Sequence, residues 1–450
     1  MIYDLLIKNG KVYLDGEIRK TNLYIKDGVI REICRESVYE AAKVIDAEGR
    51  YVFPGFIDPH VHLNDPGATE SEDFYTGTCG AAAGGVTTVL EHPLTFPLPD
   101  VLTAYDEKKK ICKKKAVTNF GLFGACSPGN EEEMQKMIHS GAVAFKAFLT
   151  YSPEIPKLND GEILEKMRFL ADKDIVLVIH CENDDIVNYS TEHMKRAGRV
   201  SPEDYSDSRP EIAEIEAVSR MCLFAREAGC KISIAHCSLS GAVEIIEKEK
   251  RMGCNVTVET CPQYLVLNRG MMNEMGVLSI CNPPLRKREE TEALWRSVLA
   301  GKVDWVCSDH APYTEEEKNQ GEDDIFRTPA GLAGIETTYQ ILFSEGVVGR
   351  GMSIEQFVRL SSENAARRYG LYPRKGALAA GSDADIVIFD PAAEWVVDPG
   401  RLKQKLPFTP YAGMRIVGKV VTTIVNGIEV YDGKEIRAER GTGNYVSPGR

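Results

Sequence analysis

The strongest constraint on the fold is an alternation that fills the middle of the chain, between about Val52 and Lys375. Short apolar segments recur there with amphipathic segments of helical spacing between them; they include GGVTTVLEHP, VTNFGLFGA, AVAFKAFLTY, DIVLVIHCEN, KISIAHCSL, CNVTVETCP and VDWVCSDHAP. Strands that are apolar on both faces are typical of a parallel sheet covered by helices. Seven or eight such units predict an α/β fold, a (β/α)8 TIM-like barrel. A doubly wound open sheet is the alternative, but no glycine-rich phosphate loop follows the first strand.

The two ends of the chain have a different pattern. DLLIKNGKVYL, NLYIKDGVIREI and KVIDAEGRYVF at the start indicate short strands separated by Asn-Gly, Asp-Gly and Glu-Gly turns. ADIVIFDP and RIVGKVVTTIVNGIEVYDG near the end indicate further strands and hairpins. We therefore expect residues 1–52 and 377–450 to form one small β-sandwich from both ends, and residues 53–376 to form the barrel.

Composition excludes several classes of function. The net charge of −13 over 450 residues argues against a nucleic-acid partner, and the basic run Lys108–Lys115 reads as a solvated helix end. The first residues lack the pattern of a signal peptide, and no apolar run is long enough to predict a membrane span. The twelve cysteines form no Cys-x-x-Cys pair. These features predict a cytoplasmic protein with reduced thiols and no membrane partner.

Polar side chains stand within or directly after several of the apolar segments. In a (β/α)8 barrel, the carboxyl ends of the strands converge on the active site. Imidazole and carboxylate groups suit zinc or a similar divalent ion. The candidate ligands are His60, His62, His180, His236 and Asp309, and Lys146 stands among them within its own apolar segment.

Each candidate also has a purely structural interpretation. A lone histidine at a strand end is more often a hydrogen-bonded structural residue, but His60 and His62 share one face of a strand and can chelate together. Asp309 alone could cap a helix in SDHAP. The period of two along a strand turns Cys181 and Cys237 away from the neighbouring histidines, which argues against thiolate ligands.

Lys146 is the unusual member of the set, because it lies inside the apolar run AVAFKAFL. A lysine in such a place usually extends to the edge of the apolar region. Burial would instead lower its pKa and leave a neutral amine. Such an amine can add carbon dioxide and become a carbamate, which offers two oxygens to metal ions.

The motifs also resemble a known family. HVHLNDPG, TGTCGAAAGGVTTVLEHP, FKAF, IHCEN, AHCS, ETCPQYL, SDHAP and GSDADIVIFDP occur in this order. Together they resemble the cyclic-amide branch of the amidohydrolase superfamily, which includes hydantoinases, dihydropyrimidinases, allantoinases and dihydroorotases. The resemblance spans essentially the whole chain. It implies a distorted (β/α)8 barrel with a small β-sandwich, two divalent metal ions per chain and a homotetramer.

The resemblance also implies a role for each site residue. His60, His62 and Asp309 would bind the first metal ion, His180 and His236 the second, and carbamylated Lys146 would bridge both. Asp309 would take the proton of the attacking water and return it to the leaving nitrogen. Tyr151 would donate to the developing oxyanion; its structural alternative is a buried core tyrosine.

The substrate ring is less strongly specified. Dihydroorotases generally have an arginine where this chain has Asn64, and many allantoinases have an arginine where it has Ala68. Asn64 could line the pocket or cap its turn. By resemblance, Asn282, Ala330 and Gly331 stand at positions that bind the edge of the substrate. The lack of cationic anchors favours a neutral ureide ring over a carboxylate-bearing ring.

The sequence therefore predicts metal-dependent hydrolysis of a cyclic amide bond in a small ureide. Hydantoinase or dihydropyrimidinase-like activity is the first expectation, allantoinase the alternative, and dihydroorotase less favoured. Scaffold proteins with this fold that have lost metal ligands form another class, but this chain retains the complete set. Hydrolysis of a linear β-aspartyl peptide is a further alternative, which a turnover assay would distinguish.

Overall fold

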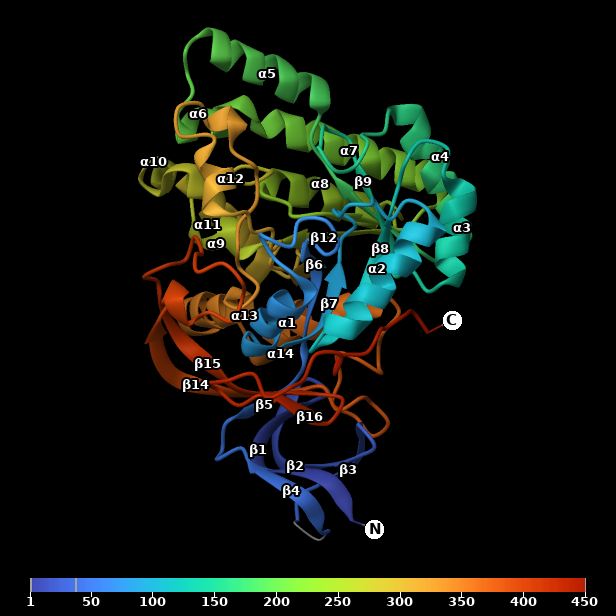
Figure 1. Cartoon of the computed structure of the whole chain (residues 1–450), viewed down its shortest axis with the longest axis vertical. Helices are drawn as coiled ribbons and strands as arrows, with labels where there is room; N and C mark the ends of the chain where they lie inside the picture. The colour runs from blue at the N-terminus through green and yellow to red at the C-terminus, as the bar shows by residue number, and fades with distance from the viewer. Residues whose placement is uncertain (1, 37–38, 450) are drawn as a thin grey trace.

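The computed structural model describes residues 2–36 and 39–449, with a helix-covered barrel above a β-domain in the view of Figure 1. Eight parallel strands follow one another in chain order around the barrel. They are β6 (Phe56–Val61), β7 (Val86–Glu91), β8 (Asn119–Ala125), β9 (Ala144–Phe148), β10 (Val176–His180), β11 (Ile232–Ile234), β12 (Val256–Thr260) and β13 (Trp305–Val306). The predicted barrel is confirmed. The open doubly wound sheet is wrong, because spatial neighbours are consecutive strands throughout.

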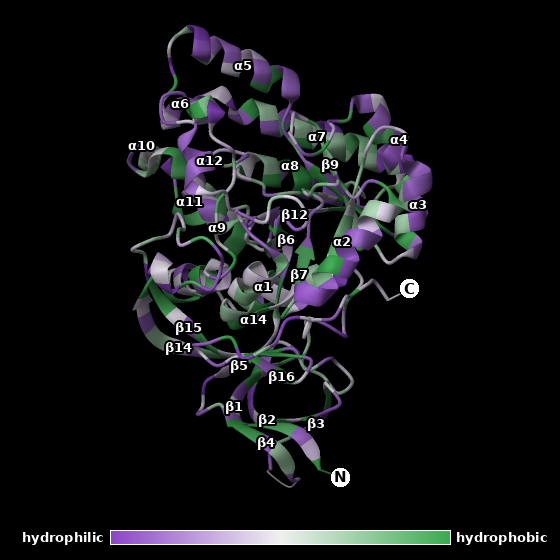
Figure 2. Ribbon diagram, viewed as in Figure 1, coloured by the Kyte–Doolittle hydropathy of each residue, from purple (hydrophilic) through white to green (hydrophobic). Residues whose placement is uncertain are grey.

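The barrel strands owe their form to burial on both faces. Every residue of the five strands from β6 to β10 is buried, as expected of continuous apolar runs. In Figure 2, β7 is largely green and α5, on the outside of the molecule, is largely purple. Val61 forms a parallel bridge with His310, and His310 forms another with Leu332. These bridges bring the segment after β13 next to β6, so the barrel is nearly closed.

Helices surround the barrel and connect its strands. The α-helices are α1 (Phe74–Ala83), α2 (Leu102–Lys115), α3 (Glu131–His139), α4 (Asp160–Leu170), α5 (Asp184–Arg196), α6 (Pro202–Ser208), α7 (Glu211–Ala228), α8 (Ser240–Arg251), α9 (Pro262–Val266), α10 (Met272–Met275), α11 (Arg288–Leu299), α12 (Glu315–Asn319), α13 (Thr338–Ile341), α14 (Ile354–Val358) and α15 (Asn364–Arg368). A capping box of Asn159 and Glu162 starts α4, and Gly229 in the left-handed conformation ends α7. Local sequence therefore sets these helix limits.

The remaining strands form one sheet from both ends of the chain, as predicted. They are β1 (Tyr3–Leu14), β2 (Glu17–Lys26), β3 (Val29–Cys34), β4 (Ala41–Asp46), β5 (Tyr51–Pro54), β14 (Ile386–Val396), β15 (Arg415–Val425) and β16 (Ile428–Tyr431). β5 pairs with β1 on one side and with β14 on the other. β5 also leads directly into β6, so the first barrel strand is joined to this sheet. Near the C-terminus the chain returns to the barrel, where the Val446 amide donates to the Phe120 carbonyl at 2.8 Å.

One predicted turn is wrong. Asp27-Gly28 and Glu48-Gly49 do form turns, but Asn9-Gly10 lies within the single long strand β1 as a bulge. Asn9 adopts a left-handed backbone with φ of 59°, and its amide donates to the Asn22 side chain at 3.0 Å. The ladder with β2 continues on both sides of the bulge, so long-range pairing overrides the local turn signal.

The basic run Lys108–Lys115 forms the second half of α2, as predicted, with one exception. Lys108 is buried and donates to the Glu91 carboxylate and to the His92 carbonyl, each at 3.1 Å. Its solvated interpretation is therefore wrong. Among the described residues, none of the helices combines the length and the apolar character that a membrane crossing requires.

Candidate metal centre

The six predicted ligands meet at the carboxyl-terminal side of the barrel strands. They come from β6 and its extension, from β9 and β10, and from the segments after β11 and β13. All but one are buried, and the exception, Asp309, has a side chain that is only 13% exposed. In chain order they are His60, His62, Lys146, His180, His236 and Asp309.

The side chains form two groups of facing donor atoms. In the first, Nε2 of His60 and Nε2 of His62 each lie 3.2 Å from Oδ1 of Asp309. In the second, Nδ1 of His180 lies 3.1 Å from Nε2 of His236. The His60 and His236 rings are 5.3 Å apart between centroids, so the groups are neighbours. The ligand sets implied by the resemblance thus correspond to two spatial groups.

Buried carboxylates hold the outer nitrogens of two of these histidines. Nδ1 of His60 contacts Glu259, and Nε2 of His180 lies 2.7 Å from Glu182. Glu182 also accepts from Nε of Arg209 at 3.0 Å. An acid behind an imidazole fixes its tautomer and directs the other nitrogen inward, which is the arrangement of metal-binding histidines.

Glu182, Glu259 and His92 were not predicted as site residues, although they lie in the motifs IHCEN, ETCPQYL and VLEHP. The available signal was a polar residue at the end of an apolar segment, the same signal that identified the ligands. His92 directly follows β7, and its ring stacks on that of His60 with centroids 3.6 Å apart.

Lys146 is completely buried, and its Nζ has no hydrogen-bond partner among the residues that the structure describes. Burial lowers the pKa of this amine, while Glu259 and Asp309 act in the opposite direction. A buried amine without a counter-charge in contact favours the neutral form that can react with carbon dioxide. The environment of Lys146 therefore fits a carboxylated lysine.

The surroundings of three of the histidines favour the neutral imidazole. Burial lowers the pKa of His60 and of His236 well below the usual value, and neighbouring histidines and Lys146 lower it further. Burial also lowers the pKa of His180, although Glu182 opposes the shift. A neutral imidazole keeps the lone pair that a metal ion requires. Burial raises the pKa of Glu259 to about 7.

Two of the site residues have an unusual backbone. His236 has a φ of 36° and Asp309 a φ of 48°, both in the left-handed region. Few residues other than glycine adopt this conformation, and those that do concentrate at functional sites. It directs both side chains to the strand ends after only three residues of β11 and two of β13.

The structure indicates a bracing position for Asn64. Its carbonyl accepts from the Ala68 amide at 3.0 Å, and its side-chain nitrogen lies 3.4 Å from the Pro312 carbonyl. It has a left-handed φ of 54°. Asn64 thus fixes the turn after His62 and joins it to the loop after Asp309.

Asn282, Ala330 and Gly331, the other predicted substrate residues, lie on two neighbouring segments that Lys318 connects by hydrogen bonds. The Asn282 side chain accepts from the Tyr205 hydroxyl at 2.7 Å, and the Gly331 amide donates to the Ile280 carbonyl at 2.9 Å. Ala330, beside Gly331, packs against the core. Lys318 donates to the carbonyls of Ile280 and Pro329, at 3.2 and 2.8 Å.

Tyr151 lies three residues beyond β9, in the loop at its carboxyl end. Its backbone amide donates to Asp184 at 3.0 Å, and the residue is 73% exposed. The alternative of a buried core tyrosine is therefore wrong. The proposed donor role remains a prediction.

The cysteines near the site do not offer thiolates. Burial raises the pKa of Cys181, Cys237 and Cys307 above the usual value, so these thiols stay protonated. The Cys181 and Cys237 thiols face the carbonyls of Ile179 and Leu239. All twelve cysteines lie in the described part of the chain and are free.

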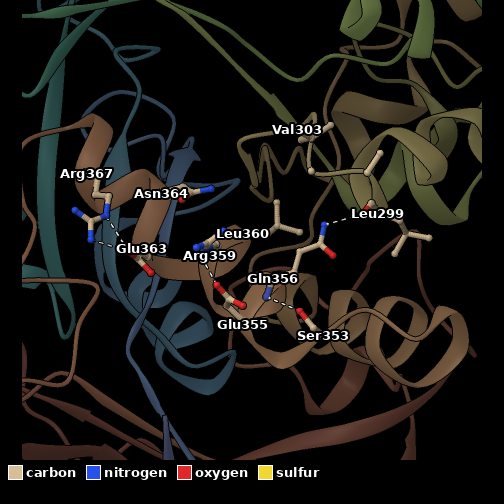
Figure 3. Close-up of a pocket in the computed structure, with 12 residues that line it drawn as sticks. Leu299, Val303, Ser353, Glu355, Gln356, Arg359, Leu360, Glu363, Asn364 and Arg367 are labelled. Atoms are coloured by element: carbon tan, nitrogen blue, oxygen red, sulfur yellow. Dashed lines mark hydrogen bonds and ion pairs between the residues drawn. The ribbon is translucent and has the colours of Figure 1, made fainter. Parts of the chain in front are cut away.

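A cleft of about 590 Å³ lies elsewhere, between the segment that precedes β13 and the helices α14 and α15 (Figure 3). Its charged residues are already paired, with Glu355 and Arg359 2.8 Å apart and Glu363 and Arg367 2.8 Å apart. The segment before β13 belongs to the amino end of the barrel, whereas Asp309 follows the carboxyl end. This cleft is therefore separate from the histidine cluster.

Fold and site together define a class of protein: a (β/α)8 barrel enzyme with a histidine-rich candidate metal centre at the carboxyl ends of its strands. Comparison with known proteins then identifies the family. The model described as "Amidohydrolase family" matches residues 51–430. The chain belongs to the amidohydrolase family. Members of this family generally bind a binuclear metal centre, and the histidine cluster is compatible with one.

Named relatives confirm the cyclic-amide branch. The chain is 36% identical to an allantoinase of Solibacter usitatus, over 99% of this chain and 97% of the relative, and 37% identical to an allantoinase of Rubrobacter xylanophilus, over 100% and 98%. Among solved structures, an L-hydantoinase (dihydropyrimidinase) from Arthrobacter aurescens matches with a TM-score of 0.97 and 33% identity, over 99% of this chain and all of the other. A D-hydantoinase from Thermus sp. matches with a TM-score of 0.93 and 29% identity, over 99% of both.

Proposed function

We propose that the protein hydrolyses an amide bond of a neutral cyclic ureide, with a hydantoin or 5-substituted hydantoin as substrate and an N-carbamoyl amino acid as product. The observation that carries this proposal is the pair of donor groups at the strand ends, with buried Lys146 near enough to both to lower the pKa of His60 and of His180. The resemblance to hydantoinases of known structure supports it.

We propose two divalent ions, zinc in the first instance, with His60, His62 and Asp309 holding one, His180 and His236 the other, and carbamylated Lys146 between them. The ions would supply Lewis acidity at the ring carbonyl and an activated water. The described residues fit this demand, because burial lowers the pKa of His60 and of His236 and Lys146 is an amine in a buried, polar cluster.

The protein's own groups then move the proton and orient the ring. Asp309 accepts the proton of the attacking water through a carboxylate oxygen and donates it to the leaving ring nitrogen. We assign the Tyr151 hydroxyl as donor to the carbonyl oxygen, because its loop follows β9 at the carboxyl end of the barrel. The segments around Asn282 and Gly331 contact the amide edge of the ring.

The charges around the cluster favour a neutral ring. The buried guanidinium groups of Arg209 and Arg286 are each paired with a glutamate, Glu182 and Glu214. Lys318 is satisfied by two carbonyls, and burial lowers its pKa to about 7. A substrate carboxylate would find these cations already engaged, which argues against dihydroorotate.

Allantoin is the second candidate, and the identity of 36–37% to allantoinases supports it. Allantoin is a substituted hydantoin, so the same ring chemistry serves both. The position after Pro66-Gly67 is Ala68, which offers no cation to the substituent of that ring. We also propose a cytoplasmic homotetramer that acts on this small molecule without a nucleic-acid or membrane partner.

The test is a turnover panel on one zinc-loaded preparation, with hydantoin, 5-substituted hydantoins, dihydrouracil, allantoin and dihydroorotate as substrates. We expect the highest kcat/KM for a hydantoin and the lowest for dihydroorotate. A wide lead for allantoin would replace the first candidate by the second. A lead for dihydroorotate would refute the argument from the paired cations.

A further inference from the structure

His92 is a fifth imidazole in the cluster, and the proposed ligand set does not use it. It directly follows β7, is completely buried, and lies beside both His60 and His62. One nitrogen from each of these three rings lies within 4.8 Å of the other two. By distance alone, the three rings could form a metal site.

The orientation of the rings excludes that interpretation. The His60 and His92 rings are stacked, with centroids 3.6 Å apart and planes inclined by only 10°. The lone pair of an imidazole nitrogen lies in the plane of its ring. An ion in the plane of the His60 ring would lie roughly 3.5 Å outside the plane of the His92 ring, whereas a zinc–nitrogen bond is about 2 Å long and in-plane. His92 and His60 therefore cannot bind the same ion while they are stacked.

The stack is held by contacts on both sides of His92. Its Nε2 lies 3.2 Å from the Pro59 carbonyl, so this nitrogen carries the proton and donates. Its backbone amide donates to Val61 at 3.0 Å, and its carbonyl accepts from buried Lys108 at 3.1 Å. The Phe123 ring contacts it with centroids 4.5 Å apart. The His92 ring is thus fixed before any ligand arrives.

We propose that His92 is a positioning residue, which holds the plane of the His60 ring by stacking so that the inward nitrogen faces Asp309. Glu259 fixes one edge of that ring, and the flat face of His92 limits its rotation. This inference rests on the proposed metal centre and adds a residue outside its ligand set. What His92 contributes is a flat, uncharged face, and its nitrogens are not required as ligands.

The experiment compares His92→Phe with His92→Leu in the metal-depleted full-length protein. Both variants lack the nitrogens and the bond to Pro59, but only phenylalanine keeps a flat ring. The zinc dissociation constant is measured by competition with a chromophoric chelator, and unfolding of the metal-free protein is measured in urea. Phe389→Ala, a buried aromatic site in the contact between β14 and the barrel helices, is the control for general destabilisation.

We expect His92→Leu to weaken zinc binding about tenfold and His92→Phe to stay within about threefold of wild type. Phe389→Ala should lower stability without changing zinc affinity. Equal weakening in both His92 variants would show that a nitrogen is needed and would overturn the stacking role. Wild-type affinity in His92→Leu would overturn it as well. Wild-type protein that takes up no zinc would instead refute the proposed metal centre itself.

Discussion

Replacing Glu182 by glutamine tests two contributions of this carboxylate: one to the free energy of unfolding and one to zinc affinity. The Glu182 carboxylate is completely buried, lies 2.7 Å from Nε2 of His180, and accepts from Nε of Arg209 at 3.0 Å. The Arg209 guanidinium holds the pKa of this carboxyl well below the usual value against the effect of burial. Glutamine keeps the shape and an acceptor oxygen but removes the charge.

The structure gives the size of the effect. Removing one member of a buried ion pair leaves the other charge uncompensated, which costs about 3–5 kcal/mol in free energy of unfolding. We expect Glu182→Gln to lose that amount, because Arg209 is itself buried. Because the carboxyl pKa is depressed in the folded state, the pair stabilises fully above the ordinary glutamate pKa near 4.5, and this contribution is lost as pH falls through the folded-state value.

The assay is urea unfolding at pH 7 together with zinc competition. Glu227→Gln is the matched control, since Glu227 pairs with Arg168 at 2.7 Å but both side chains are more than half exposed, so little change is expected. The double variant Glu182→Gln, Arg209→Met should regain most of the stability. Its zinc affinity should remain about tenfold below that of wild type, because His180 still lacks its carboxylate. A loss below about 1 kcal/mol in Glu182→Gln would refute the assignment of this pair as a buried, compensated charge.

Three other changes test separate parts of the molecule. Lys146→Ala should lower kcat by about a hundredfold or more, since the centre loses its central ligand, and small carboxylic acids should restore part of the rate; activity with no bound metal in elemental analysis would contradict this. Asp309→Asn should keep some metal and lower kcat about 10²–10⁴-fold, and near-wild-type turnover would move the proton transfer to another group. Glu336→Gln should become more stable relative to wild type as pH rises, because burial raises the pKa of Glu336 to about 8. Above pH 4.5, wild type must take up a proton on this carboxyl when it folds or bury the charge, and glutamine needs neither. The stability difference in urea should grow by roughly 3 kcal/mol from pH 5 to pH 8, and a constant difference would contradict it.

The barrel and the candidate ligands were predictable because both depend on rules that act along the chain. A continuous apolar run such as DIVLVIHCEN predicts a buried parallel strand. It also predicts a site residue, since the polar residue at its end must lie at the carboxyl face of the barrel. The β-domain was predictable for a similar reason, because hairpin patterns occur only at the two ends. These inferences need no knowledge of which side chain contacts which.

The contacts that order the site were not predictable in the same way. His60 meets Glu259 across 199 positions of sequence, and Asn9-Gly10 has the composition of a turn but lies in a strand because β2 pairs across it. Neither fact has a local signature. The exposure of Tyr151 is of the same kind, because a loop residue after β9 can face the core or the solvent with equal local propensity.

Unpartnered buried polar atoms provide an argument for the site that does not depend on any resemblance. Native folds give nearly every buried polar group a hydrogen-bond partner. A cluster of exceptions therefore indicates a functional site, where polar groups are held without a partner at a cost in stability. Among the described residues, thirteen buried side-chain atoms have no partner, and six of them belong to one cluster. These six come from Asp58, His60, His62, His92, Lys146 and His236. Since the two acids behind His60 and His180 are fully engaged, the unpartnered atoms are not a general defect of packing in this region. Five of the six lie on imidazoles and on the amine of Lys146, which are the kinds of group that bind a divalent ion and, for a neutral amine, carbon dioxide.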